Sequence, residues 1–374
     1  MLNRQYKVAI IGAGAAGIGM SVALKQYGLK DHIVLEKGQV GNSFQHWNTQ
    51  TRFISPSFTT NGFGVPDLNA VTPTTSPAFT LLEEHPSGPE YQAYLNSLVD
   101  YYQLPVEEHA DVVQIEKAAN DQYHIHLADH SLIVAEYVII ALGDYSFPDT
   151  ANIKNAELGR HYRDIKEYDQ FIGQGPQTII GGNESAFDLA THLAALGIQS
   201  TLYTAEPAFN LDEPDPSKRL STYTFNNFQP FESSITVKND AKVVQIEKIG
   251  DQYQLDFANG AKQLITSQPL LATGFSNTQS KLVKDLFAVE NARAVLNDED
   301  ESTRTKNVFM VGPEVVHGKV ILCYVYKYRQ RFAPLAELIL RRDNQPINTE
   351  VAEQYRINNM YLKNLSNCAV DCDC

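Results

Sequence analysis

Tyr6-Lys7-Val8-Ala9-Ile10-Ile11-Gly12-Ala13-Gly14-Ala15-Ala16-Gly17 is the stretch that decides the fold. A short apolar strand runs directly into the pattern GxGxxG, and an alanine-rich helical segment follows to about Gly28. A second predicted strand, Ile33-Val34-Leu35, ends at Glu36, nineteen residues after Gly17. The first glycine of such a pattern allows a tight turn, the second admits a pyrophosphate, and the third lets helix and strand pack closely. Because the helix N-terminus attracts phosphates and Glu36 can accept from ribose hydroxyls, the stretch predicts an adenine dinucleotide site.

Composition limits the remaining possibilities. The chain of 374 residues is long enough for two domains with substantial cores. Its net charge of −14 argues against nucleic acid as the main partner, which requires a basic face. Glycines interrupt the first apolar run, so it is not a signal peptide, and no apolar run is long enough to span a membrane. Three of the four cysteines lie in the last seven residues and form no secreted disulfide framework, so we expect a cytoplasmic protein.

The segment after Glu36 carries the single Trp of the chain, within Gly41-Asn42-Ser43-Phe44-Gln45-His46-Trp47. From there to about Pro89 the sequence is rich in Thr, Ser, Pro and Phe and has little periodicity. Long loops inside compact domains are usually functional or disordered, and the aromatic content argues against disorder. We therefore expect an ordered excursion that lines a site. A helix should begin near Pro89, and its stripe of Tyr and Leu side chains at helical spacing indicates core packing.

Two segments of the chain repeat. Val112–Lys117 returns as Val243–Lys248, and Ala141-Leu142-Gly143 returns as Ala272-Thr273-Gly274. Each copy alternates apolar and polar residues as hairpin strands do, and then ends in a buried strand and a glycine. A second strand and Gly turn, Thr178–Ala186, heads the second copy, with Asn183 in place of the second glycine and Ala186 in place of the third. The repeat indicates two related dinucleotide modules.

The sequence thus predicts an α/β protein with two Rossmann-like dinucleotide-binding domains, the second inserted in the first, of the three-layer ββα type. The expected boundaries are 1–150 plus 300–345 for an FAD-binding domain, 151–299 for an NAD(P)H-binding domain, and 346–374 for a C-terminal helix and Cys-rich tail. We expect the last strand of the first domain at Asn307–Gly312, followed by a helix from about Tyr326 to Arg342.

Two dinucleotide modules in one chain favour hydride transfer from a nicotinamide to a flavin, for which the protein supplies the alignment. Glu36 suits the unphosphorylated ribose of FAD. No carboxylate directly follows Tyr203 in the second module, so the 2′-phosphate of NADPH is admitted there, although NADH remains an alternative. Lys218 and Arg219 either reach that phosphate or are solvated surface cations.

The chain resembles the flavin-containing monooxygenase-like branch of bacterial NAD(P)/FAD-dependent oxidoreductases, over roughly residues 5–345. This resemblance is carried by both Gly turns, Glu36, the Gly41–Trp47 segment and the glycines that end the repeated strands. It implies that FAD lies on the first turn and NADPH on the second, with Ser43, His46 and Trp47 along the flavin. The predicted cofactor-binding residues are Gly12, Gly14, Ala15, Ala16, Gly17, Glu36, Lys37, Ser43, His46, Trp47, Val113, Ala141, Gly143, Gly181, Asn183, Glu184, Ser185, Ala186, Gly274, Gly312 and Lys319.

The sequence also departs from the patterns of related enzymes. The monooxygenase fingerprint appears only in shortened form, as Leu158-Gly159-Arg160-His161-Tyr162. No CxxC or CxxxxC pair lies beside the expected flavin site, and Ala15-Ala16 lacks the single Cys that bacillithiol-disulfide reductases carry in the first Gly turn. Pro313 replaces the usual acidic partner after Gly312, so ribityl contacts should come from backbone or from Lys319.

The chain ends with Cys368, Cys372 and Cys374. These cysteines form a dithiol arm that carries electrons from reduced flavin, a soft-metal clamp, or an incidental frayed terminus. Asp371 and Asp373 raise the thiol pKa by like charge, which slows thiolate chemistry away from a cation. We list the three as catalytic candidates and assign no metal site. Cys323 is expected to be a buried small hydrophobe.

The leading hypothesis is an NAD(P)H-dependent FAD oxidoreductase that reduces a small-molecule or disulfide substrate through its C-terminal cysteines. One alternative is a flavin-containing monooxygenase that acts on a small soft nucleophile or carbonyl. A further alternative is an FAD-binding redox sensor with a metal-binding tail. No nucleic acid or membrane partner is expected, and a homodimer is compatible with the sequence.

Overall fold

A computed structural model describes residues 4–59, 66–209 and 212–365. Its contacts divide the chain into two compact units. Unit 1 comprises residues 1–45, 55–147 and 276–374, and unit 2 comprises residues 46–54 and 148–275. The chain therefore passes from one unit to the other at the peptide bonds 45/46, 54/55, 147/148 and 275/276.

A seven-stranded sheet forms the centre of unit 1, in the order β3-β2-β1-β6-β5-β4, with β17 also paired to β6. Its strands β1, β2, β3, β6 and β17 run parallel, while β4 and β5 form an antiparallel extension. Apolar runs rich in β-branched residues make the second half of β1, β2 after His32 and the end of β6 fully buried, as strands covered on both faces are. The strand bounds are Arg4–Ile11 (β1), His32–Leu35 (β2), Val106–Glu107 (β3), Val112–Lys117 (β4), Tyr123–Leu127 (β5), Leu132–Ile140 (β6) and Val308–Met310 (β17).

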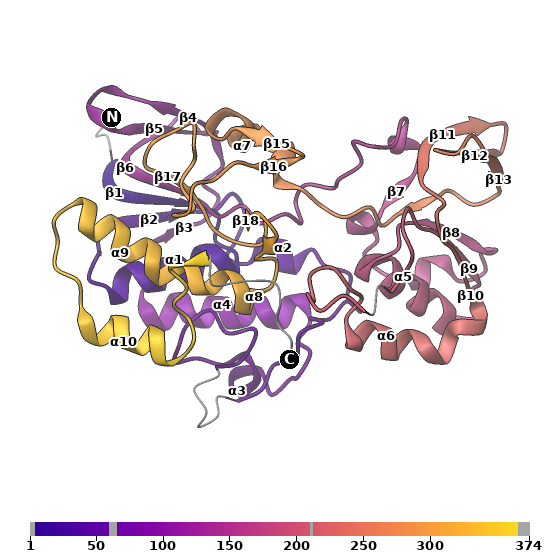
Figure 1. The fold of residues 1–374 in the computed structure, drawn as a ribbon, viewed down its shortest axis with the longest axis horizontal. Coiled ribbons are helices and arrows are strands. Elements are labelled where there is room, and N and C mark those ends of the chain that lie inside the picture. The colour runs from indigo at the N-terminus through magenta and orange to yellow at the C-terminus, as the bar shows by residue number, and fades with distance from the viewer. Residues whose placement is uncertain (1–3, 60–65, 210–211, 366–374) are drawn as a thin grey trace. The chain divides into compact units, whose positions relative to one another are not determined.

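Helices of unit 1 pack beside this sheet, and α1, α4 and α9 gather below β1 and β2 in Figure 1. A Cβ added at Gly19 of α1 would lie 2.3 Å from the ring of Phe332, so α1 and α9 pack closely. The helix bounds are Ala15–Gln26 (α1), Asn42–Gln45 (α2), Pro77–Leu81 (α3), Gly88–Tyr102 (α4), Lys281–Leu286 (α7), Val325–Tyr328 (α8), Phe332–Arg342 (α9) and Thr349–Ile357 (α10). Short hairpins pair Val289–Glu290 (β15) with Arg293–Ala294 (β16) and Val316–His317 (β18) with Val320–Ile321 (β19).

The single helix predicted from about Tyr326 to Arg342 is in fact interrupted. A 3-10 turn, Arg329–Arg331 (η7), separates α8 from α9. Pro334 in the first turn of α9 explains the break, because it has no N–H for the carbonyl of Gln330 and its ring crowds that carbonyl. The amide of Leu362 donates to the Gln330 carbonyl instead, at 2.9 Å.

The other local predictions for unit 1 agree with the structure apart from their ends. Strands β4 and β5 form the predicted antiparallel hairpin. Helix α4 begins one residue before Pro89, capped by Ser87 and Glu90, and the predicted stripe is buried at Tyr91, Tyr94, Leu95 and Leu98. Cys323 is half-buried rather than fully buried.

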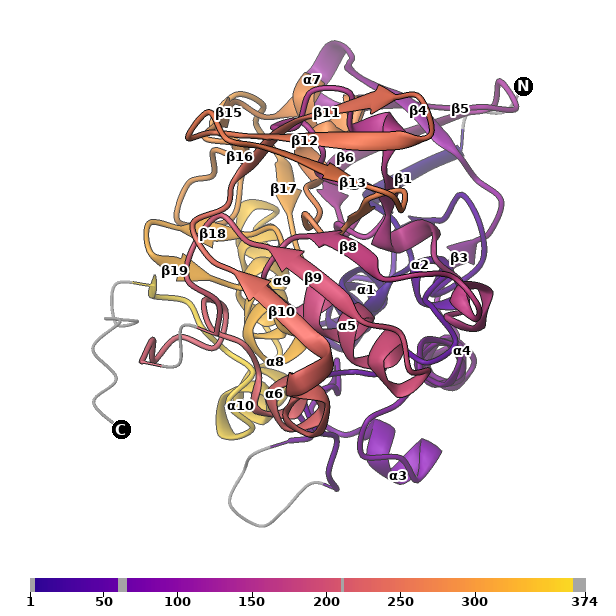
Figure 2. The ribbon, with the colours of Figure 1, turned by 90° about the vertical axis from the view of Figure 1, so that its right-hand side faces the viewer.

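Unit 2 contains a five-stranded sheet in the order β10-β9-β8-β14-β7, with all paired strands parallel. A separate antiparallel sheet, β11-β12-β13, lies in sequence between β10 and β14, and Figure 2 shows β8, β9 and β10 side by side. The bounds are Arg160–His161 (β7), Gln177–Ile180 (β8), Ser200–Tyr203 (β9), Ile235–Lys238 (β10), Val243–Ile249 (β11), Gln252–Phe257 (β12), Lys262–Ile265 (β13), Leu270–Leu271 (β14), Glu184–Ala195 (α5) and Thr222–Phe228 (α6).

Two apolar clusters cover the two faces of this parallel sheet. Leu270 belongs to the cluster that includes Phe187 and Leu193 of α5, whereas the next residue, Leu271, belongs to the cluster that includes Val243 and Leu255 of the antiparallel sheet. Successive residues of a strand point to opposite faces, so unit 2 is built in three layers.

The end of the described chain is fixed to unit 1. The predicted C-terminal helix is α10, which begins at Thr349 behind the Asn348 cap and ends at Ile357, and Asn359 adopts a left-handed conformation. Arg331 Nη1 then donates to the Leu362 carbonyl at 2.7 Å. Cys368, Cys372 and Cys374 lie outside the described residues. Within the described ranges, the structure contains no helix with the length and hydropathy required to cross a membrane.

Candidate functional site

The first Gly turn joins β1 to α1 and is fitted tightly to β6. Gly12 has φ +108°, and a Cβ added there would lie 2.5 Å from the carbonyl oxygen of Ala141. A Cβ at Gly17 would lie 1.9 Å from the Gly12 carbonyl oxygen. A Cβ at Gly14, by contrast, would meet no atom within 4 Å among the described residues. The turn is therefore packed against the protein at Gly12 and Gly17 and open at Gly14. Because Gly14, the N-cap of α1, has no side chain to cap the helix, the first amides of α1 remain available to an anion.

Glu36 lies directly after β2 and is almost fully buried beside this turn. Its carboxylate accepts hydrogen bonds from the backbone amides of Ala13, at 2.8 Å, and Gly38, at 2.9 Å. Each oxygen thus uses one of its two lone pairs and keeps one. The remaining lone pairs can accept from ribose hydroxyls, so these residues fit the adenine dinucleotide that the sequence predicts.

Some of the other predicted residues of unit 1 lie near the first Gly turn or the end of β6, and others have exposed side chains. Ala16 and Gly312 are brought together, since a Cβ at Gly312 would lie 3.2 Å from the Ala16 Cβ. Gly143, with φ +60°, follows β6, and Ser43 lies in α2. Lys37, Val113 and Lys319 instead have exposed side chains. The predicted trio along the flavin is divided between the units, because Ser43 belongs to unit 1 whereas His46 and Trp47 belong to unit 2.

The second Gly turn repeats the backbone contacts of the first. A Cβ at Gly181, which has φ +141°, would lie 2.2 Å from the carbonyl oxygen of Ala272, as Gly12 meets Ala141. The Gly181 amide donates to the Tyr203 carbonyl at 3.0 Å, and the Gly12 amide donates to the Leu35 carbonyl at 2.8 Å. These contacts align Gly14 with Asn183, Gly17 with Ala186, and Glu36 with Thr204.

The N-terminus of α5 lies within the second Gly turn. The helix begins at Glu184, and Asn183 is an exposed N-cap whose side chain makes no cap hydrogen bond. Ala186 is fully buried under the turn. The Glu184 carboxylate accepts from the hydroxyls of Ser221 and Thr224 at the start of α6, so its side chain is committed to the protein. Burial raises the pKa of Glu184, and these hydrogen bonds oppose that rise. The Ala186 amide donates to the Asn183 carbonyl at 2.9 Å, so the amides of Glu184 and Ser185 are the ones that remain available to a pyrophosphate.

Thr204 is buried where unit 1 has Glu36. Its hydroxyl donates to the Glu206 carbonyl at 2.8 Å, and a Cβ at Gly182 would lie 2.1 Å from that hydroxyl oxygen. The position of unit 2 that aligns with Glu36 is thus neutral and compact.

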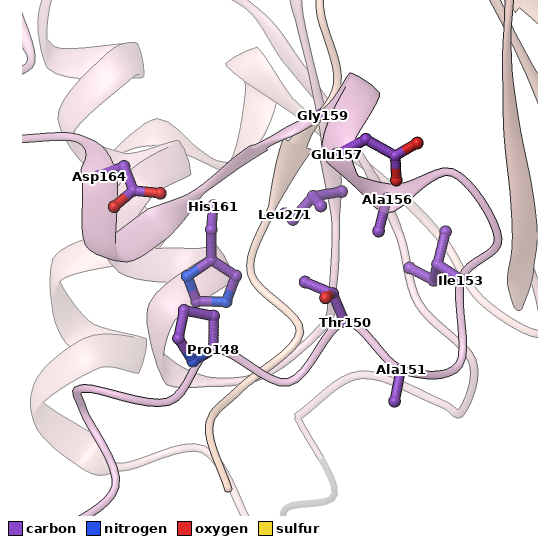
Figure 3. Close-up of a pocket in the computed structure, with 10 residues that line it drawn as sticks. All are labelled: Pro148, Thr150, Ala151, Ile153, Ala156, Glu157, Gly159, His161, Asp164 and Leu271. Carbon is purple, nitrogen blue, oxygen red and sulfur yellow. The ribbon is translucent and has the colours of Figure 1, made fainter. Parts of the chain in front are cut away.

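His161, the histidine of the shortened monooxygenase fingerprint, lines a pocket of about 520 Å³ in unit 2 (Figure 3). Its Nε2 lies 3.2 Å from the Gly274 carbonyl, and its Nδ1 accepts from the Arg163 amide at 3.2 Å. Burial lowers the pKa of His161, which keeps the ring neutral near neutral pH. Both ring nitrogens are therefore engaged by backbone, at the predicted residue Gly274 among others. The pocket is lined by Pro148, Thr150, Ala151, Ile153, Ala156, Glu157, Gly159, His161, Asp164 and Leu271.

Two polar clusters were not anticipated from the sequence. In unit 2, Asp188 of α5 accepts hydrogen bonds from Tyr162 and Tyr168. In unit 1, the buried Asp300 lies 2.7 Å from Arg331 Nε and 2.6 Å from His317 Nε2, and so holds the hairpin that carries Lys319. Neither cluster has a sequence signature, because its members are far apart in the chain. In the described part of the chain, no cluster of His, Cys, Asp or Glu could hold a metal ion.

Comparison with known proteins identifies relatives over most of the chain. The family model described as pyridine nucleotide-disulphide oxidoreductase matches residues 9–312. Bacilliredoxin reductase Bdr of Bacillus subtilis is 24% identical over 345 residues, which cover 91% of this chain and 99% of that protein. A Baeyer-Villiger monooxygenase of Pseudomonas aeruginosa is 26% identical over 227 residues, or 57% of this chain and 40% of that protein.

A solved structure shares the fold. The bacillithiol disulfide reductase Bdr of Staphylococcus aureus superposes with a TM-score of 0.69 at 18% sequence identity, covering 91% of this chain and 99% of that chain. At this identity the likeness concerns the fold.

Proposed function

Because the chain belongs to the pyridine nucleotide-disulphide oxidoreductase family, we propose that its two Gly turns serve the two halves of one electron transfer. The chain is a flavin oxidoreductase that uses FAD and NAD(P)H. The observation that carries the proposal is the duplicated turn, in which Gly12 and Gly181 meet the carbonyls of Ala141 and Ala272 in the same way. We assign FAD to unit 1 and the nicotinamide dinucleotide to unit 2, as the inserted domain.

Unit 1 holds FAD through backbone and one carboxylate. The open face at Gly14 and the free amides of α1 receive the pyrophosphate, and Glu36 accepts from the ribose. Bound FAD supplies the redox centre that accepts a hydride equivalent from NAD(P)H. Because Glu36 is itself fixed by two backbone amides, its acceptor positions are set before the cofactor arrives.

Unit 2 receives NAD(P)H at the N-terminus of α5. Asn183 reaches into the pyrophosphate position, where its amide can donate, and Thr204 leaves the ribose position without negative charge. A carboxylate there would repel a 2′-phosphate, so the neutral Thr204 favours NADPH over NADH. Lys218 and Arg219 are the cations of the following loop that we propose for the phosphate.

We propose a disulfide as the electron acceptor. NAD(P)H supplies a hydride, solvent supplies one proton, the S–S bond breaks, and two thiols and NAD(P)⁺ are formed. The similarity to bacilliredoxin reductase Bdr over nearly the whole of both chains supports this acceptor class. Since Ala15-Ala16 offers no thiol in the first Gly turn, we assign the relay to Cys368, Cys372 and Cys374, on the sequence alone.

Deletion of residues 367–374 tests this assignment. The truncated enzyme should keep its FAD and its rate of flavin reduction by NADPH, but lose turnover with disulfide acceptors. Cys323→Ser, which alters a half-buried thiol of the described chain, is the matched control and should retain turnover. If the truncated enzyme reduces every disulfide as fast as the full chain, the tail relay is wrong. If neither NADPH nor NADH reduces the bound flavin, the function as a whole is wrong.

A monooxygenase is the second candidate, favoured by the similarity to the Baeyer-Villiger enzyme and by the residual fingerprint at His161. His161 is neutral and held by Gly274 and Arg163, which suits a structural role better than proton transfer. Aerobic NADPH oxidation distinguishes the two functions. Oxygen consumption that is coupled stoichiometrically to an oxygenated ketone or sulfide product would favour the monooxygenase.

A further inference from the structure

Nine residues, His46–Ile54, break the continuity of unit 1. They lie in sequence between α2 and Ser55, both of which belong to unit 1, yet they pack as part of unit 2. We call them the strap. The strap adds two chain crossings, at 45/46 and 54/55, to the two that bound residues 148–275.

Hydrogen bonds to backbone carbonyls connect the first half of the strap with residues 165–166 of unit 2. The Asn48 side-chain amide donates to the Ile165 carbonyl at 3.2 Å, and the Thr49 amide donates to the Lys166 carbonyl at 3.2 Å. Lys166 Nζ donates in return to the His46 carbonyl at 2.5 Å. Asn48 is buried, so its bond to the Ile165 carbonyl is not exposed to competing water.

A carboxylate on α5 holds the second half. Asp188 Oδ2 accepts from the hydroxyls of Tyr162 at 2.6 Å, Tyr168 at 2.7 Å and Thr51 at 3.2 Å, and Thr51 Oγ1 also lies 2.8 Å from the Tyr162 hydroxyl. The other oxygen, Oδ1, lies 3.4 Å from His192 Nε2. Burial opposes ionisation, but the His192 and tyrosine hydrogen bonds outweigh it and lower the pKa of Asp188. Four donors thus converge on one ionised carboxylate.

We propose that Asp188 is a positioning residue for hydride transfer, and that it acts by holding the strap to α5 through Thr51. The inference rests on the proposed function, in which the N-terminus of α5 binds the nicotinamide dinucleotide. Asp188 lies one helical turn beyond that N-terminus, at Glu184. The strap directly follows α2, which itself follows Glu36 of the unit that we assign to FAD. The carboxylate therefore connects the helix that binds one dinucleotide to the chain that leads from the other.

Such a connection should affect the rate of hydride transfer more than the affinity for either cofactor. Neither Thr51 nor Asp188 is among the residues assigned to a cofactor, so removing their contact should leave the affinities largely intact, whereas the rate of hydride transfer depends steeply on how donor and acceptor are aligned. Small misplacements far from the reacting atoms are enough to slow a reaction by about tenfold to a hundredfold.

Thr51→Val tests the proposal, because it removes the hydroxyl while preserving shape and leaves Asp188 with its other donors. In the FAD-loaded protein, stopped-flow reduction by NADPH should show a limiting rate that is lower by about tenfold. Half-saturation should stay within about twofold of wild type. Thr51→Ser should restore the rate. Thr236→Val, at an exposed threonine of β10, is the matched control and should behave as wild type.

Hydrogen exchange provides a readout that does not depend on activity. The amides of residues 46–54, and above all that of Thr49, should exchange faster in Thr51→Val than in wild type or Thr236→Val. Unchanged exchange would show that Thr51 does not hold the strap, and faster exchange with an unchanged limiting rate would show that the strap has no positioning role. Either result overturns the inference. Failure of the proposed function is recognised separately, because wild-type flavin would then not be reduced by NADPH or NADH.

Discussion

The two Gly turns agree where backbone meets backbone and differ where a ligand would lie. Gly12 and Gly181 make the same contact with a carbonyl of the neighbouring strand. The aligned positions that we assign to a ligand diverge: Gly14 corresponds to the exposed Asn183, and the buried carboxylate of Glu36 corresponds to the buried, neutral Thr204. Geometry within the protein has been kept in both copies, while the chemistry offered to a ligand has not.

This difference corresponds to the different demands on a bound cofactor and an exchanged one. Unit 1 offers bare backbone and a fixed buried carboxylate, so it suits a dinucleotide that stays bound. Unit 2 offers one side chain at the pyrophosphate and no charge at the ribose, so it suits a dinucleotide that binds and leaves at every turnover.

Substitutions at the third position of the Gly turn, Gly17 in unit 1 and Ala186 in unit 2, should differ most in their effects. Gly17→Ala places a Cβ against the Gly12 carbonyl, and we expect loss of bound flavin and a fall of about 3 kcal/mol in the free energy of unfolding. The reverse change in unit 2, Ala186→Gly, should cost only about 1 kcal/mol through helix propensity. Flavin absorbance and urea unfolding measure both effects. Wild-type flavin content in Gly17→Ala would contradict the tight fit.

Removal of the buried Glu36 carboxylate should lower the affinity for FAD and leave the affinity for NADPH unchanged. Glu36→Ala leaves the amides of Ala13 and Gly38 unpaired and removes the ribose acceptor, at a cost of about 1.5–3 kcal/mol, or roughly ten- to a hundredfold in FAD affinity. Glu116→Ala, at an exposed position of β4, is the control. Flavin content after gel filtration is the measurement. Full occupancy of the variant at micromolar protein would refute the role of Glu36.

Acid should destabilise unit 1 through His32, which aligns with Ser200 of unit 2. Burial lowers the pKa of His32 to about 4, and its ring nitrogens lie 2.8 Å from Ser21 Oγ and 3.0 Å from the Leu29 carbonyl. The unfolded chain takes up this proton near the ordinary pKa, so the stability present above that pKa is lost as pH falls toward 4. We expect a loss of about 2 kcal/mol between pH 7 and pH 5.

Urea unfolding of wild type and of His32→Gln at several pH values checks this expectation. The variant should show the shallower dependence on pH because it has no imidazole to protonate. Parallel pH profiles would assign the acid sensitivity to other groups.

The smallest effect should come from a negative charge added at the proposed NADPH site of unit 2. Asn183→Asp adds a negative charge beside the proposed pyrophosphate and should raise half-saturating NADPH by about tenfold, or about 1.4 kcal/mol, without changing bound FAD or the limiting rate. Asn183→Gly, which copies unit 1, should bind at least as well as wild type. We prefer Asn183 to Ala186 for this test because Ala186 is fully buried and an acid there would disturb the core. Unchanged half-saturation in Asn183→Asp would place the pyrophosphate elsewhere.

Local sequence predicted the parts of the fold that local sterics control. Gly12 and Gly181 could be found because only glycine fits a turn that close to a neighbouring carbonyl. The repeated segments could be recognised as hairpins because strand alternation is a local pattern, and both pair antiparallel. Pro334 was also visible, and its effect on the helix that begins near Tyr326 could have been anticipated.

The strap and the polar clusters could not be predicted in this way. Thr51 meets Asp188 across 137 residues, and Asp300 meets Arg331 across 31 residues, with no periodicity in either partner. The resemblance placed His46 and Trp47 together with Ser43, but a loop without a repeating pattern contains no signal for the unit that it joins. Such pairs come together only in the completed fold, and nothing in the local sequence distinguishes these side chains from others of the same type.

The four chain crossings have a consequence for synthesis on the ribosome. When residue 275 has been made, every segment of unit 2 exists, including the strap. Unit 1 at that moment still lacks β17, which pairs with β6, and α9, which packs on α1. Domains usually fold as units while the chain emerges, with those nearer the N-terminus first. Here the order is reversed: unit 1 must wait with an unpaired stretch of β6 until β17 and α9 have been made, so the FAD uptake that we propose for unit 1 follows the completion of unit 2.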